Sequence, residues 1–120
     1  MKIIEKKAFQ VEKRTSGMFT GTIDMISLIN KDMGSKDLQI INVIFPPGVK
    51  SNFHFHDHDQ VLYALEGNGF FTTDNEERKV TKGDIVLIPG GEKHSHGATE
   101  DSAFSMLNIL VADTKTTRIQ

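Results

Sequence analysis

Short segments that favour β-strands recur along the whole chain, and Gly, Pro, Asn and Asp residues separate them. No helical stripe longer than a turn or two lies between them. Pro46-Pro47-Gly48 and Pro89-Gly90-Gly91 end two apolar segments, because proline cannot donate a hydrogen bond to a sheet. Many short strands with turn signals between them are typical of an all-β sandwich or barrel. The expected strands are 18–26, 38–45, 51–56, 61–65, 69–73, 78–81, 85–88 and 103–111.

Length and composition exclude several classes of protein. The 120 residues suit one domain with a single core. The 14 Lys and Arg residues are scattered and the net charge is -2, which argues against nucleic acid as a partner. The absence of cysteine excludes disulfides, thiolate catalysis and Cys-based metal sites. With no apolar h-region and no apolar run of roughly 18 residues, the sequence predicts a cytoplasmic protein without a membrane segment.

All five histidines lie between residues 54 and 96, in two groups. His54, His56 and His58 form the first group, and His94 and His96 form the second. Because side chains alternate along a strand, His54 and His56 project the same way, and so do His94 and His96. If both strands line one barrel, the imidazoles converge as a transition-metal site requires. A surface or hydrogen-bonded pair of histidines is the alternative for either group.

Glycine and proline spacings around these histidines define two motifs. The first is G-x5-H-x-H-x3-Q-x6-G over residues 48–67, and the second is G-x5-P-x-G-x2-H from Gly83 to His94. They resemble the two consensus motifs of the cupins, which are jelly-roll barrels. Two positions differ, since Gln60 stands where the family has a glutamate and Ala98 where it has an asparagine. The resemblance implies a single cupin domain over residues 1–120, a double-stranded β-helix with its core motifs at 48–67 and 83–98.

Carried over position by position, the resemblance implies a metal site. Its ligands are His54, His56, Gln60 and His94, which hold a divalent first-row metal. Manganese is the first choice, and iron, nickel, cobalt and zinc are alternatives. His58 falls outside the ligand positions, on a loop between strands. His96 looks into the pocket beside the metal, either as a catalytic acid or base or as a hydrogen-bonding neighbour of the ligands.

Gln60 changes the charge of such a site. A glutamate would bring one negative charge to the metal, whereas the Gln60 amide oxygen brings none, so a divalent ion keeps its full charge. The site is then a stronger Lewis acid, which favours anionic ligands and disfavours oxidation to the trivalent state. This indicates lyase or isomerase chemistry in preference to oxygen activation. The alternative is that Gln60 marks a site that no longer binds metal.

A closer resemblance covers most of the chain. The stretches "FTGTIDM", "FPPGVKSNFHFH" and "PGGEKHSHGA" are similar to those of small bacterial cupins with the same three-histidine, one-glutamine set. Some of these are manganese-dependent hydroxynitrile lyases, with a further base histidine at the position of Met106. The chain is therefore expected to act on a small carbonyl, hydroxy or unsaturated-acid substrate. A metal-dependent dioxygenase and a non-catalytic small-molecule or metal-binding cupin are the alternatives.

Alternation along the last strand defines the expected cavity wall. Phe104, Met106, Asn108 and Leu110 share one face, so Met106 and Asn108 are candidates for the wall of a mostly apolar pocket. Plain barrel core is the alternative for the apolar residues, whereas a buried Asn108 needs a partner such as a substrate or water. The polar ends, 1–14 and 113–120, are expected to fray or to pair with a neighbouring subunit. Small cupins cover sheet edges by pairing them across subunits, so a homodimer that exchanges 18–26 is expected.

Overall fold

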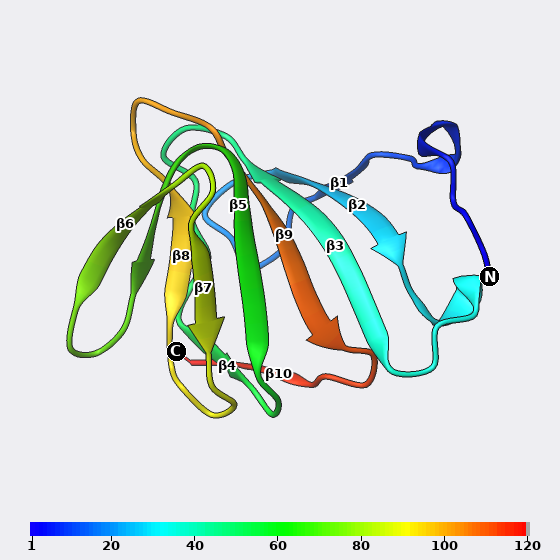
Figure 1. Ribbon diagram of the computed structural model, residues 1–120. Helices are drawn as coiled ribbons and strands as arrows, with labels where there is room; N and C mark the ends of the chain where they lie inside the picture. The colour runs from blue at the N-terminus through cyan, green and yellow to red at the C-terminus, as the bar shows by residue number, and fades with distance from the viewer. Residues whose placement is uncertain (120) are drawn as a thin grey trace.

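The structure is a computed structural model that describes residues 1–119, and most of its regular structure is β-strand (Figure 1). Two single-turn 3-10 helices, η1 (Lys6–Ala8) and η2 (Lys31–Met33), are the helical elements of residues 1–119. None of the described helices is long and apolar enough to cross a bilayer. The all-β prediction is confirmed. The strands are β1 (Glu12–Arg14), β2 (Ile23–Ile29), β3 (Leu38–Phe45), β4 (His54–His56), β5 (Gln60–Thr72), β6 (Glu77–Thr81), β7 (Ile85–Ile88), β8 (Ser95–Ala98), β9 (Phe104–Val111) and β10 (Thr116–Arg118).

Strand β5 connects the two layers of the barrel. Its first half pairs with β7 and β9, and its second half pairs with β6 and β8. The main sheet runs β1-β2-β3-β9-β5-β6, with antiparallel pairing throughout. Strands β4 and β10 form a separate pair that lies across one end of the barrel in Figure 1. A bridge between His54 and His94 joins β4 to the segment before β8, so the two groups of histidines meet there.

The predicted strands 38–45 and 85–88 match β3 and β7, and each ends directly before its proline. Two other predictions need correction. The segments 61–65 and 69–73 form the single strand β5, which stays paired through a register shift between Ala64 and Glu66. The segment 18–26 begins as a strand only at Ile23. The homodimer that would exchange this segment stays a prediction.

The expectation that both ends fray or pair with another subunit is wrong for two segments. Glu12–Arg14 pairs with β2, and Thr116–Arg118 pairs with β4, both within the chain. These pairings satisfy backbone groups of β2 and β4 that would otherwise form open sheet edges. Residue 120 lies outside the described residues.

The core lies between the layers and follows the expected alternation. Phe45, Phe104 and Met106 are essentially inaccessible to solvent, and they pack in one cluster that also holds Ile23, Val43, Leu62, Ala64, Phe71, Val80, Ile88 and Ala98. Large apolar side chains from β3 and β9 meet there, because these strands pair along their whole length. Next to this core lie the polar residues of the motifs, of which His54, His56, Gln60, His94 and His96 are buried.

The backbone at residue 67 explains why the first motif has a glycine there. Its φ angle of +81° lies in the left-handed region that glycine adopts freely. A Cβ atom there would overlap the carbonyl oxygen of Ala103, where β5 crosses the start of β9. Gly83 has a similar φ of +93°, but open space surrounds its Cβ position. An added Cβ would therefore cause backbone strain at both glycines but steric overlap only at Gly67.

We expect Gly67→Ala to lower the free energy of unfolding by about 3 kcal/mol, because left-handed strain and overpacking add. Gly83→Ala is the matched control and should cost about 1 kcal/mol, from the backbone strain alone. Urea denaturation of both variants measures the difference. Equal losses in the two variants would show that the close approach of β5 to residue 103 does not constrain the fold.

Candidate metal centre

Three histidines from the two motifs meet inside the barrel. His54 and His56 lie on β4, and His94 lies just before β8. The backbones of His54 and His94 exchange two hydrogen bonds, each 2.9 Å long, which fixes the two segments side by side. All three rings are buried, and they offer nitrogen atoms that lie within 4.8 Å of one another. This cluster could hold a metal ion, as the alternation of the two strands predicted.

Hydrogen bonds orient the three rings. Nδ1 of His54 lies 2.7 Å from the Asn52 carbonyl oxygen, and Nδ1 of His94 lies 2.8 Å from that of Glu92. A carbonyl oxygen only accepts, so each Nδ1 carries the hydrogen and each Nε2 keeps its lone pair. Nδ1 of His56 contacts the Thr116 hydroxyl at 2.8 Å. Such partners fix the direction in which a ligating imidazole points its other nitrogen.

The Gln60 amide is oriented by Asn108. Its Nε2 donates to Asn108 Oδ1 over 2.7 Å. Its Oε1 is buried and has no hydrogen-bond partner among the described residues, and the same holds for Nε2 of His56 and of His94. A buried polar atom without a partner costs about 1–3 kcal/mol, so three of them side by side need an explanation. Imidazole nitrogens and an amide oxygen are donors that a first-row divalent ion accepts, so these residues fit a metal.

Burial keeps the cluster neutral. Desolvation, together with the neighbouring imidazoles, lowers the pKa of His56 to about 4. The pKa of His94 is lowered to about 4 with desolvation as the first cause, and burial also lowers the pKa of His54. Neutral imidazole is the form that binds a metal. The rings are therefore ready to act as ligands across the physiological pH range.

The other two histidines lie where the sequence placed them. His58 is exposed on the loop after β4, and its Nδ1 lies 2.9 Å from Asp57. His96 is 5 % exposed and stacks on His94 with ring centroids 5.7 Å apart. Phe45 and Phe71 contact its ring from other sides. Its Nδ1 has no hydrogen-bond partner among residues 1–119, and burial holds its pKa well below the usual value.

A cavity of about 250 Å³ opens onto this cluster. Polar groups form one part of its wall, with His54, His56, Gln60, His96, Asn108 and Thr116. Apolar side chains form most of the rest, with Met18, Phe19, Ile23, Met25, Val43, Phe45 and Met106. The structure thus places both predicted pocket residues, Met106 and Asn108, in the cavity wall. Thr116 and Arg14 also line it and were missed, because both belong to terminal strands that were expected to be loose.

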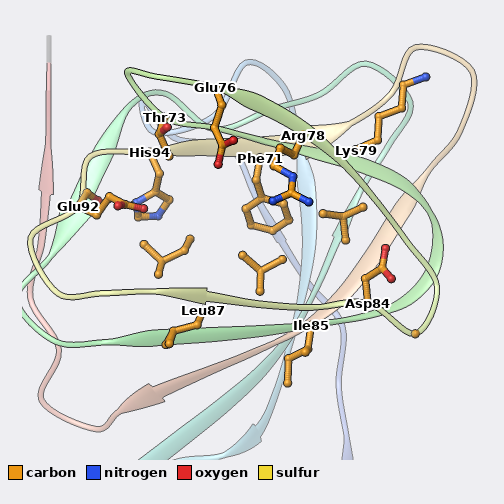
Figure 2. A pocket seen from close by; sticks show the side chains of 14 residues that line it. Phe71, Thr73, Glu76, Arg78, Lys79, Asp84, Ile85, Leu87, Glu92 and His94 are labelled. Atoms are coloured by element: carbon orange, nitrogen blue, oxygen red, sulfur yellow. The ribbon is translucent and has the colours of Figure 1, made fainter.

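A larger hollow of about 640 Å³ borders the cluster from the side of β6 and β7. Figure 2 shows His94 at one end of it, with Glu76 and Arg78 above the ring of Phe71. Of the predicted ligands, only His94 borders this hollow. The other three ligand positions and His96 line the smaller cavity, so a molecule that reaches all of them enters there.

Comparison with known proteins agrees with the barrel. The family model for the Cupin domain (Cupin_2) matches residues 41–110, more than half of the chain. The chain belongs to the cupin family. A cupin-like protein from Thermotoga maritima is 28% identical, with a TM-score of 0.85 over 93% of this chain and 87% of that one. The prediction of a double-stranded β-helix barrel of the cupin type is confirmed.

Relatives within the cupin family carry different activities. This cupin is 30% identical to an (R)-mandelonitrile lyase from Granulicella tundricola, over 81% of this chain and 74% of the lyase. It is 32% identical to an acireductone dioxygenase from Xenopus tropicalis, over 50% of this chain. The match spans 36% of that dioxygenase and, in a Methanocaldococcus jannaschii relative, 45% of its length. The expected class, a lyase, and the alternative class, a dioxygenase, thus both occur among the relatives.

The lowered pKa values predict how stability depends on pH. Between pH 6.5 and about 4 the unfolded chain binds protons on residues 56 and 94 that the folded cupin does not, so stability falls as pH falls. For metal-free protein we expect a loss on the order of 2 kcal/mol between about pH 7 and about pH 5, measured by urea denaturation.

A double variant tests the source of this pH dependence. His56→Gln, His94→Gln should show a flatter profile, because it removes both groups whose pKa is lowered to about 4. An unchanged slope in the double variant would place the titrating groups elsewhere.

Proposed function

We propose that this cupin is a metal-dependent enzyme of the lyase or isomerase type, acting on a small carbonyl, hydroxy or unsaturated-acid compound. One observation carries the proposal: Asn108 accepts from the amide nitrogen of Gln60, which leaves the uncharged oxygen without a partner in the cavity that His54 and His56 also line. The donor set therefore carries no negative charge. A set of this kind suits charge stabilisation on a substrate better than a change of metal oxidation state.

The ligands in this proposal are Nε2 of His54, His56 and His94 and Oε1 of Gln60. They would hold a divalent first-row ion, manganese before iron, nickel, cobalt or zinc, and these similar ligands accept several of them. When bound, such an ion supplies Lewis-acid chemistry, which polarises a carbonyl or stabilises an alkoxide or enolate. The buried surroundings strengthen any such interaction, because little water screens it.

His96 is proposed as the group that moves a proton. Its Nδ1 has no hydrogen-bond partner among the described residues, so it would be available to accept a proton from a substrate carbon or hydroxyl and return it to the product. Burial opposes this protonation, and the anion formed on the substrate beside the ring would offset that cost. Ser51 fixes its backbone on both sides, since Ser51 N donates to the His96 carbonyl and Ser51 Oγ accepts from its N–H. Met106, which stands where the resembled lyases have a base, is fully buried and apolar. Cleavage of a cyanohydrin would then also depend on His96.

A metal-dependent dioxygenase is the second candidate, supported by the similarity to an acireductone dioxygenase over half of the chain. A three-histidine site serves such enzymes as well. Oxygen uptake distinguishes the two candidates, because a lyase or isomerase turns over without consuming oxygen. A cupin that binds its ligand without any turnover would belong to the third, non-catalytic class.

We expect the purified protein to contain about one first-row metal ion per chain, measured by elemental analysis. His56→Ala should reduce the metal content at least about ten-fold, because it removes one of four ligands. His58→Ala is the matched control and should keep the wild-type content, since His58 lies on an exposed loop. Equal content in wild type and His56→Ala would contradict the site.

Gln60→Glu should weaken the binding of small anions by about ten-fold or more, because it adds a negative charge in a buried site. Azide binding to the cobalt-loaded protein, followed by its visible absorption, measures this. Gln10→Glu adds the same charge at an exposed position and should leave the affinity unchanged. Equal or tighter azide binding in Gln60→Glu would refute the Lewis-acid argument.

A further inference from the structure

Arg14 is the single arginine, lysine or carboxylate residue among the described side chains that line the smaller cavity. Of the three histidines that line the cavity, His54 and His56 belong to the proposed metal site. The other polar members, Ser16, Gln60, Asn108 and Thr116, carry no charge. Apart from an ion bound at the cluster, Arg14 is therefore the one side chain of the cavity wall that brings a full positive charge to an anionic group of a ligand.

Strand pairing explains why Arg14 reaches the cavity. Arg14 lies directly opposite Ile23 in the β1–β2 pair, and Ile23 is completely buried in the core. Opposite residues of an antiparallel pair point to the same face, so the arginine side chain follows Ile23 toward the interior. Its long aliphatic stem can cover apolar wall while its guanidinium stays at the mouth. Lys13 lies opposite Asp24 on the other face and pairs with it at 2.8 Å.

One exposed ion pair competes with a ligand for the guanidinium of Arg14. Its one ion pair among the described residues is to Glu12, at 3.9 Å, and both side chains are at least half exposed. Such exposed pairs contribute little free energy and exchange readily with other partners. A guanidinium presents parallel N–H groups that match a carboxylate in a two-point contact.

We propose that the substrate is a small carboxylate with an apolar body, whose carboxylate binds Arg14 at the mouth of the cavity. This rests on the proposed function, because the oxygen group at its other end would face the three histidines and Gln60. Met18, Phe19, Met25, Phe45 and Met106 would contact the body between the two ends. The volume of about 250 Å³ lies below the usual range for drug-sized ligands, which restricts the substrate to a short molecule.

The larger hollow does not select a ligand by charge in this way. It is lined by Arg78 and Lys79 but also by Glu76, Asp84 and Glu92 (Figure 2). The opposite charges of these side chains offset one another. The proposed preference for an anionic ligand therefore applies only to the smaller cavity.

The test compares carboxylates with their neutral esters. Pyruvate, 4-oxopentanoate and 6-oxoheptanoate, each beside its methyl ester, are titrated calorimetrically into the metal-loaded wild type, Arg14→Gln and Lys13→Gln. We expect the wild type to prefer at least one acid over its ester. Arg14→Gln should weaken binding of that acid by about 10- to 100-fold and leave the ester unaffected, because only the charged contact is lost. Lys13→Gln should match the wild type, since Lys13 points to the other face.

Three results would overturn the inference: unchanged acid binding in Arg14→Gln, equal losses for acid and ester, or no preference for any acid in the wild type. Metal content is measured on the same preparations. Arg14→Gln should keep its metal, since Arg14 contacts none of the ligand residues. A wild type without metal that still shows the Arg14-dependent preference would refute the proposed function and support the carboxylate site.

Discussion

The two hydrogen bonds between the backbones of His54 and His94 are the contact on which the site depends. They join segments that lie 40 positions apart in the sequence, and they bring the two rings to a centroid separation of 4.4 Å. The local carbonyls of Asn52 and Glu92 then turn both Nε2 atoms inward. Nε2 of His94, like Nε2 of His56, is buried and has no hydrogen-bond partner among the described residues, and a bound ion would offset the cost of leaving it unpaired. The ring positions, the Nδ1–H tautomers and the burial of the rings therefore all favour a bound metal ion.

Gln60 and Asn108 act as one unit. An amide can present either its oxygen or its nitrogen, and the Asn108 oxygen decides this by accepting from Gln60 Nε2. A glutamate at residue 60 has no N–H to donate, so Asn108 would have to turn its own amide to serve it. Asn108, on the strand β9 that pairs directly with β5, thus favours an uncharged amide over a carboxylate at residue 60. This pairing also gives Asn108, which is only partly buried, a role in the site that core packing does not require.

Much of this architecture could be predicted from the sequence, for a physical reason. Alternation along a strand is a local property, so it placed His54 with His56 and Met106 with Phe104 correctly. Contacts between distant segments were not predictable in the same way. Thr116 reaches His56 across 60 positions, and Arg14 reaches the cavity through its pairing with β2. Both lie in short polar strands whose sequences carry no apolar alternation. Two separate strands, 61–65 and 69–73, were predicted on either side of Gly67, whereas the positive φ of this residue lets β5 continue across the barrel.

The cupin barrel does not by itself select a reaction, since a lyase and a dioxygenase both occur among its relatives. In this chain a few side chains distinguish the possibilities. Gln60 would bring no negative charge to the proposed ligand set, Met106 places a buried thioether in the cavity wall, and His96 lines the same cavity as a neutral imidazole. With Arg14 at the mouth, positive potential would lie at both ends of an otherwise apolar cavity once an ion is bound. A short molecule with two oxygen-bearing ends satisfies that distribution, whereas a purely apolar molecule leaves Arg14 without a ligand contact.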